Sequence, residues 1–113
     1  MDFGSYLRQL RKGRRLTQGQ LAAAVGIDYT YVSKVENGRV DPPSEVTIRR
    51  IAAVLAVDAE ELLANAGKVS AELKDAAASE PQLALLLRTI GKKPLTADQY
   101  RRMREIVEEP SSG

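Results

Sequence analysis

The sequence predicts an all-α protein, with a five-helix domain at residues 1–67 followed by a C-terminal helical extension. Apolar residues recur every three or four positions along most of the chain, which is the periodicity of amphipathic helices. Serine, threonine or aspartate precedes most of these segments, and glycine follows several of them, as at helix termini. The 113 residues are enough for one compact domain and an appendage.

The first two helices are marked by apolar spacing and by capping residues. Apolar residues recur at helical spacing in the first helix, at Phe3, Leu7 and Leu10. We expect this helix to end near residue 14. The second helix is expected over 18–25 because a capping box precedes it, with Thr17 as the N-cap and Gln20 returning to it. Gly26 then makes the turn, since glycine adopts positive φ at no steric cost.

The third, fourth and fifth helices are also bounded by capping and breaking residues. Their predicted N-caps are Asp28, Ser44 and Asp58. Gly38 ends the third helix, Gly67 ends the fifth, and the proline pair at 42–43 breaks the chain before the fourth. The predicted core of the five helices is Leu7, Leu10, Leu21, Val25, Ile27, Val32, Val35, Ile48, Ile51, Leu55, Leu62 and Leu63. Burial of each such side chain contributes roughly 1.5–3 kcal/mol, which suffices for a small fold.

Composition excludes several classes of function. The chain has no cysteine and no histidine, so it lacks thiolate ligands, the commonest metal ligand and the commonest general base. The adjacent glutamates at 60–61 and 108–109 do not face each other on a helix. We therefore expect no enzyme activity, no cofactor and no metal site. No apolar run is long enough to span a membrane, and Met1–Ser5 does not begin a secretory signal, so a cytoplasmic protein is expected.

The distribution of charge is more informative than the formal net charge of +2. Residues 1–57 hold nine lysines and arginines and five acidic residues, which gives this segment a charge of about +4. Basic charge concentrated in one segment attracts phosphate groups. The alternative interpretation of the charge alone is a solvated surface on a small helical domain.

Residues 18–37 are typical of a helix-turn-helix. They contain two short helical segments joined by a tight turn at Gly26, and the small residue Ala22 lies where the second helix must approach closely. This arrangement holds one helix away from the body of the domain, at the angle needed to enter the DNA major groove.

The third helix can be projected at about 100° per residue. Val32 and Val35 define its inward direction. The outward residues are polar, with a tyrosine at the flank: Thr30, Ser33, Lys34, Asn37 and Tyr29. Lysine can donate to guanine, and hydroxyl groups can donate, accept or touch a thymine methyl group. We therefore expect base contacts from Tyr29, Thr30, Ser33 and Lys34. A plain solvated face is the alternative.

The segment Phe3–Leu63 resembles the helix-turn-helix domain of the lambda repressor and Cro type, the XRE family of bacterial and phage regulators. The matching stretches are LRQLRKGRRLTQGQLAAAVGI, YVSKVENGR and PPSEVTIRRIAAVLAVDAEELL. The resemblance implies a lambda-repressor-like fold and a sequence-specific, double-stranded-DNA-binding transcriptional regulator. It further implies a repressor that binds an inverted-repeat operator as a homodimer.

The resemblance also implies roles for individual residues. The family's phosphate-binding glutamine corresponds to Gln18, at a helix N-terminus that already favours anions. The family's ion pair between helices corresponds to Arg11 and Glu36, for which a structural role is expected. Further phosphate contacts are expected from Tyr31, Asn37 and Arg39, although packing is an equal alternative for the tyrosine. The acid at position 41 departs from the more basic relatives and argues against extensive contacts with the DNA backbone.

The C-terminal region matches no family pattern. Residues 68–79 are alanine-rich and polar, which indicates a helical or partly ordered connector. A helix is expected to begin near Pro81 and to stop at Gly91. A second capping box at 96–99 opens the last helix. Residues 110–113 are interpreted as a disordered tail, either native or added.

The two C-terminal helices carry apolar faces that a second copy of the chain could cover. We expect residues 80–109 to form a dimerisation region, through Leu83, Leu86, Leu87, Ile90, Tyr100, Met103 and Val107. Dimerisation would place two recognition helices in successive major grooves, about 34 Å apart. One alternative is that this region packs back on the domain. Another is that it binds a partner protein, as in an antitoxin or adaptor that uses its helix-turn-helix for autoregulation.

Overall fold

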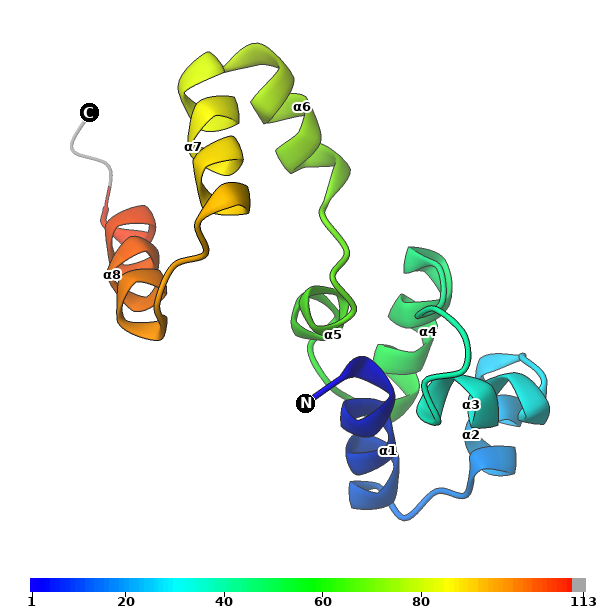
Figure 1. Cartoon of the computed structure of the whole chain (residues 1–113). Helices are drawn as coiled ribbons and strands as arrows, with labels where there is room; N and C mark the ends of the chain where they lie inside the picture. The colour runs from blue at the N-terminus through cyan, green and yellow to red at the C-terminus, as the bar shows by residue number, and fades with distance from the viewer. Residues whose placement is uncertain (111–113) are drawn as a thin grey trace. The chain divides into compact units, whose positions relative to one another are not determined.

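The computed structural model describes residues 1–110 and confirms the all-α class (Figure 1). Eight helices are present in the described residues: α1 (Phe3–Gly13), α2 (Gln18–Val25), α3 (Tyr29–Glu36), α4 (Glu45–Leu55), α5 (Ala59–Asn65), α6 (Ala71–Ser79), α7 (Pro81–Lys92) and α8 (Ala97–Glu108). None of them is both long and apolar enough to cross a membrane. The last three residues of the predicted tail lie outside the described residues.

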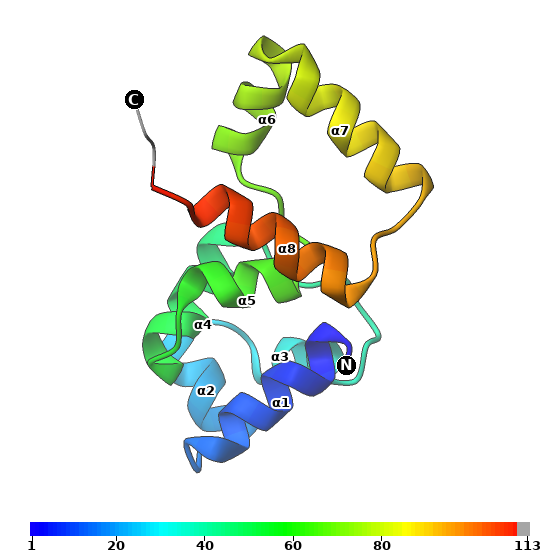
Figure 2. The ribbon, with the colours of Figure 1, turned by 90° about the vertical axis from the view of Figure 1, so that its left-hand side faces the viewer.

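The helices divide into two compact units, with the boundary after Val69. Helices α1 to α5 form the first unit, in which α2 contacts α3 and α4, α1 contacts α3, and α4 contacts α5 (Figures 1 and 2). In the second unit α6 packs against α7. The segment 68–79, interpreted from sequence as a connector, thus contains a helix of the second unit.

The predicted helix starts are confirmed in detail. Thr17 and Gln20 form the capping box of α2, with the Thr17 backbone N–H donating to Gln20 Oε1 at 2.9 Å and the Gln20 N–H donating to Thr17 Oγ1 at 3.0 Å. The predicted N-caps of α3, α4 and α5 accept backbone hydrogen bonds in the same way. Each cap satisfies amide groups that the helix leaves without internal partners.

The chain turns through positive φ after several helices, at a glycine in some cases and at another residue in others. The three glycines predicted to turn the chain adopt positive φ: Gly26 at +84°, Gly38 at +70° and Gly67 at +70°. After α1 and α4, the residues with positive φ are not glycines. They are Arg15, at +58°, and Ala56, at +55°. The Arg14 guanidinium donates to the carbonyl oxygens of Leu55 at 2.7 Å and Ala56 at 3.2 Å. A cation therefore caps the negative end of α4.

The prediction that Gly91 ends α7 is wrong. Gly91 lies inside the helix, which continues to Lys92. The chain leaves the helix at Lys93, with φ of −139° and ψ of 89°. Because Pro94 follows, the helical conformation is disfavoured for Lys93. A glycine within a helix costs only backbone entropy, so the proline determines the end of α7.

The hydrophobic core lies in the first unit and largely matches the prediction. Ten of the twelve predicted core residues are buried; the half-buried exceptions, Leu10 and Ile27, pack against the core from its edge. Phe3, Ala22 and Ala52 are also buried. In the described part of the second unit no residue is buried. Only the first unit therefore has a well-packed interior of its own.

Candidate nucleic-acid interface

The orientation of α3 is fixed from its inner face. Val32 and Val35 are 2% and 3% exposed and belong to the core. Ala22 of α2 is equally buried, so α2 and α3 approach closely where a larger side chain would separate them. Gly26, in the left-handed conformation, provides the turn between the two helices. Packing therefore determines which face of α3 remains accessible.

The opposite face of α3 is polar and accessible. Thr30 and Lys34 are exposed, Ser33 is half-buried, and the Tyr29 side chain is 58% exposed. A β-carbon added to Gly19 in the first turn of α2 would lie 4.0 Å from Tyr29 Cδ2, so this ring lies beside the start of α2. The four predicted base-contact residues thus lie on this face, and Tyr29 is the one shown next to the α2 N-terminus.

The chain leaves α3 through a Schellman motif. The Gly38 N–H donates to the Val35 carbonyl oxygen at 3.1 Å, and the Arg39 N–H donates to the Lys34 carbonyl oxygen at 2.9 Å. These bonds fix the path of the loop, in which Arg39 is exposed and Asn37 is exposed just before the turn. Of the other predicted phosphate contacts, Tyr31 is half-buried and packs against the core.

Gln18 is the first residue of α2 and has an internal partner that the sequence did not indicate. Its Nε2 donates to Glu36 Oε1 at 3.0 Å, so the side chain is half-buried and held across the gap between α2 and α3. A primary amide carries two N–H donors, and one remains for a ligand. Gln18 also lies at the positive end of the α2 dipole, where an anion is stabilised.

The predicted ion pair between Arg11 and Glu36 is present and buried. Arg11 Nε donates to Glu36 Oε2 at 2.7 Å, and Arg11 Nη2 donates to Oε1 at 3.0 Å. The two residues are 7% and 3% exposed. Burial by itself raises the pKa of Glu36, but the hydrogen bonds from Arg11 and Gln18 and the charge of Arg11 outweigh burial and lower it. The pair joins α1 to the end of α3.

Arg8 and Gly4, which the sequence reasoning missed, complete this junction. Arg8 Nη2 donates to Asn37 Oδ1 at 2.6 Å, and Arg8 Nε lies 3.4 Å from Glu36 Oε1. Its position one turn before Arg11, on the same helix face, was the available signal. Gly4 is buried where α1 crosses the end of α3. One glycine in a helical pattern gave no signal for this close approach.

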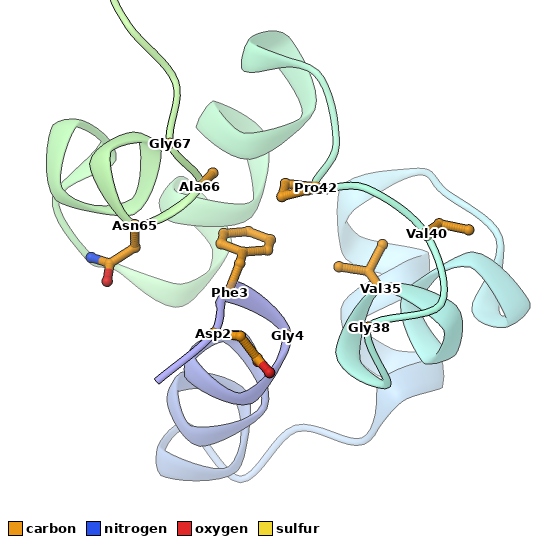
Figure 3. A pocket seen from close by; sticks show the side chains of 10 residues that line it. All are labelled: Asp2, Phe3, Gly4, Val35, Gly38, Val40, Pro42, Asn65, Ala66 and Gly67. Atoms are coloured by element: carbon orange, nitrogen blue, oxygen red, sulfur yellow. The ribbon is translucent and has the colours of Figure 1, made fainter. Parts of the chain in front are cut away.

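A groove of about 460 Å³ lies beside this junction within the first unit. Figure 3 shows the Phe3 ring between Ala66, at the end of α5, and Pro42 of the loop before α4. Val40 and Val35 continue the apolar lining toward α3. None of the four predicted base-contact residues lines this groove. The groove is therefore separate from the accessible face of α3.

A short helix held by buried valines, a glycine turn and an exposed polar face together define a helix-turn-helix DNA-binding domain. The comparison of sequences agrees: the chain belongs to the helix-turn-helix domain family, whose model matches residues 2–64. Within it the domain is of the Cro/C1, or XRE, type, which occurs in DNA-binding transcriptional regulators.

Two curated relatives come from Bacillus subtilis (strain 168). RghRB, an uncharacterized HTH-type transcriptional regulator, is 48% identical over 69 residues, which cover 61% of this chain and 50% of RghRB. RghR, an HTH-type transcriptional repressor, is 38% identical over 68 residues, which cover 60% of this chain and 50% of RghR. The chain thus spans about half the length of these relatives.

Solved structures of SinR give the corresponding structural match. SinR, the master regulator for biofilm formation, was solved in complex with DNA; the match has a TM-score of 0.51 and 30% identity and covers 54% of this chain and 97% of that one. The complex of SinR with SinI matches at a TM-score of 0.53 and 21% identity over 94% of both chains. At that identity the second match supports the fold alone, including the C-terminal helices.

Proposed function

We propose that this protein is a sequence-specific, double-stranded-DNA-binding repressor of transcription that acts as a homodimer on an inverted-repeat operator. The observation that carries the proposal is the exposed polar face of α3, beside Gln18 at the positive end of α2. SinR, which shares this domain, was solved on DNA. RghR, which also shares it, is a repressor.

In this proposal α3 lies in the major groove and contacts base edges. Lys34 donates to O6 and N7 of a guanine, because an ammonium offers only donors and guanine offers two acceptors there. Thr30 and Ser33 contribute hydroxyl groups, and the threonine methyl suits a thymine methyl. Tyr29, beside the start of α2, contacts a base edge or a phosphate at the groove margin.

Phosphate contacts place the domain on the duplex. Gln18 contributes its remaining amide donor, together with the free amide groups of the first turn of α2. On the other side of α3, Asn37, Arg39 and Tyr31 face the backbone of the DNA. The acid at position 41 follows this loop and limits its basic charge. The affinity of one subunit is therefore modest, and a second subunit is needed for tight binding.

The second unit supplies the dimer contact in this proposal. Its helices carry partly exposed apolar side chains, among them Leu86 at 42%, Leu87 at 40% and Tyr100 at 45%. Leu83, Ile90 and Met103 are half-buried in the single chain, and Val107 is exposed. A second copy would complete a hydrophobic core that the described part of this unit lacks.

A different protein could cover the same apolar face, and that is the alternative function. The chain would then be an antitoxin or adaptor whose helix-turn-helix serves autoregulation. The exposed leucines of α7 are the observation that favours it. SinR was also solved in a complex with a second protein, SinI. A partner that co-purifies in a stoichiometric ratio would support this alternative.

Selection from a pool of random duplexes tests the proposed function directly. The full chain is immobilised, bound duplexes are amplified over several rounds, and the recovered sequences are aligned. We expect two inverted half-sites whose centres are about one helical turn apart, or a multiple of it. Recovery of a single unrepeated site would contradict the homodimer. Recovery of no common sequence would contradict sequence-specific binding.

A further inference from the structure

A chain of hydrogen bonds leads from α1 to the exposed face of α3. Arg8 Nη2 donates to Asn37 Oδ1 at 2.6 Å, and Asn37 Nδ2 in turn donates to Ser33 Oγ at 3.4 Å. The Arg8 side chain is 38% exposed, whereas that of Glu36, its second partner, is fully buried. Arg8 thus contacts the buried Glu36 through Nε and the exposed Asn37 through Nη2.

The guanidinium determines the orientation of the Asn37 amide. Arginine offers only donors, so the atom that faces it at 2.6 Å must be the amide oxygen and not the amide nitrogen. Rotation of the amide by 180° would place N–H groups against N–H groups. The oxygen of Asn37 is consequently engaged by Arg8, and its NH₂ group is directed toward Ser33 and the α3 surface.

This orientation restricts what α3 can present to DNA. Bidentate recognition of adenine by asparagine needs the amide oxygen and the NH₂ group aimed together at the base edge, and here the oxygen is turned toward Arg8. Asn37 can still donate, which suits a phosphate oxygen. Ser33 Oγ accepts from Asn37, so its hydroxyl hydrogen and a second lone pair remain for a base. Asn37 thus faces the duplex as a donor.

We propose that Arg8 is a positioning residue of the DNA-binding surface, which holds the Asn37 amide with its NH₂ group toward the α3 surface without itself contacting DNA. This inference rests on the proposed function and specifies how one end of α3 performs it. The charge of Glu36 does not depend on Arg8, because Arg11 and Gln18 also bond its carboxylate. Loss of the Arg8 side chain should therefore leave the domain folded.

A double-mutant cycle on the full chain tests the inference, with a labelled duplex that carries the selected operator. Asn37→Ala should weaken binding about fivefold, the usual effect of one lost hydrogen bond. Arg8→Met should weaken it by a similar factor, and the double variant by about fivefold and not twenty-five-fold. Additive losses in the double variant would overturn the proposal.

Two further measurements separate positioning from other roles. The slope of log K against log salt concentration should be unchanged in Arg8→Met, whereas loss of a direct phosphate contact would lower it by about one. Arg50→Met, which removes an exposed arginine of α4, is the matched control for charge and should change affinity by less than about twofold. Arg8→Lys keeps the charge without the fork, so full recovery of affinity by this variant would contradict positioning.

Failure of the inference and failure of the proposed function look different. If the proposed function is wrong, wild-type protein itself binds no duplex, and both ideas fall. If only the inference is wrong, wild-type protein binds its operator and the cycle is additive or the salt slope changes. Thermal unfolding of each variant by circular dichroism shows that the compared proteins are folded.

Discussion

At the scale of single residues, the buried Arg11–Glu36 pair is the most consequential interaction in the domain. Glu36 Oε1 accepts hydrogen bonds from Arg8, Arg11 and Gln18. This one carboxylate therefore binds side chains of both α1 and α2. Removal of Arg11 or Glu36 is costly, because it leaves the opposite charge buried without a partner. The same carboxylate holds Gln18, a proposed phosphate contact, in place.

Glu36→Gln should lower the free energy of unfolding by about 3 kcal/mol at pH 7, because it leaves the Arg11 charge buried without an anion. The difference from wild type should shrink in acid. The folded-state pKa of Glu36 lies below its ordinary value of 4.5, so the unfolded chain binds the proton first. The contribution is therefore complete above about pH 4.5 and is lost as the pH falls through the folded-state pKa.

Urea unfolding at pH 7 and pH 3 measures both effects. Glu61→Gln, at an exposed position of α5, is the control and should behave like wild type at both values. A difference between wild type and Glu36→Gln that stays constant with pH would show that the carboxylate charge is not what matters.

Lys34 is the residue on which sequence specificity should depend most. Lys34→Ala should cost roughly 1–3 kcal/mol of binding free energy and relax the preference at one base position in each half-site. Gln18→Ala should instead weaken binding to all sequences alike. Gel-shift titration against the selected operator and its single-base variants distinguishes the two patterns. Lys68→Ala, at an exposed site after α5, is the control. Unchanged affinity in both test variants would contradict the proposed orientation of α3.

At the scale of elements, the close approach of α1 to α3 determines where the recognition helix lies. A β-carbon on Gly4 would lie 2.5 Å from the Val35 carbonyl oxygen and 2.6 Å from that of Glu36. These are backbone atoms, which cannot move without shifting the end of α3. The glycine therefore fixes the distance between the two helices, and the Arg11–Glu36 pair depends on that distance.

Gly4→Ala should destabilise the domain by about 1–3 kcal/mol, as overpacking does, and should reduce operator binding in the fraction that stays folded. Gly13→Ala is the matched control in the same helix, with no atom within 4 Å of the added carbon. It should be neutral or stabilise by up to about 1 kcal/mol, because alanine loses less entropy in a helix. Thermal unfolding of the two variants measures the contrast, and equal melting temperatures would refute the packing argument.

At the scale of the whole molecule, the first unit has the proposed DNA contacts and the second unit has the proposed dimer contact. The core lies within residues 3–63, so a chain that ends at Val69 should fold alone. In that chain we expect a monomer by light scattering and operator binding at least tenfold weaker than in the full chain, since the second subunit no longer contributes. A truncated chain that remains a dimer would show that the dimer contact lies in the first unit.

Point variants of α7 locate the contact more closely. Leu87→Asp introduces a charge into the predicted dimerisation face and should convert the full chain to a monomer. Leu85→Asp is the matched control, because Leu85 is 66% exposed on the flank of that face. Both can be measured by light scattering over a range of concentrations. Dimers that persist in Leu87→Asp would exclude this face.

Much of the first unit followed from local chemistry in the sequence. Helix starts depend on neighbouring residues, so Thr17, Asp28, Ser44 and Asp58 could be identified as N-caps without knowledge of the fold. The buried valines of α3 followed from helical periodicity in the same way. The Arg11–Glu36 pair, in contrast, came from the family resemblance, because no local rule joins residues that far apart.

In the first unit, the sequence by itself determined the helices, most of their N-caps, most of the core and which face of α3 is polar, because these depend on interactions within a few residues. Only the tertiary structure showed that Arg14 caps α4 and that Arg8 holds Asn37. Those features depend on side chains that meet across helices. A pattern along the chain carries no information about such distances.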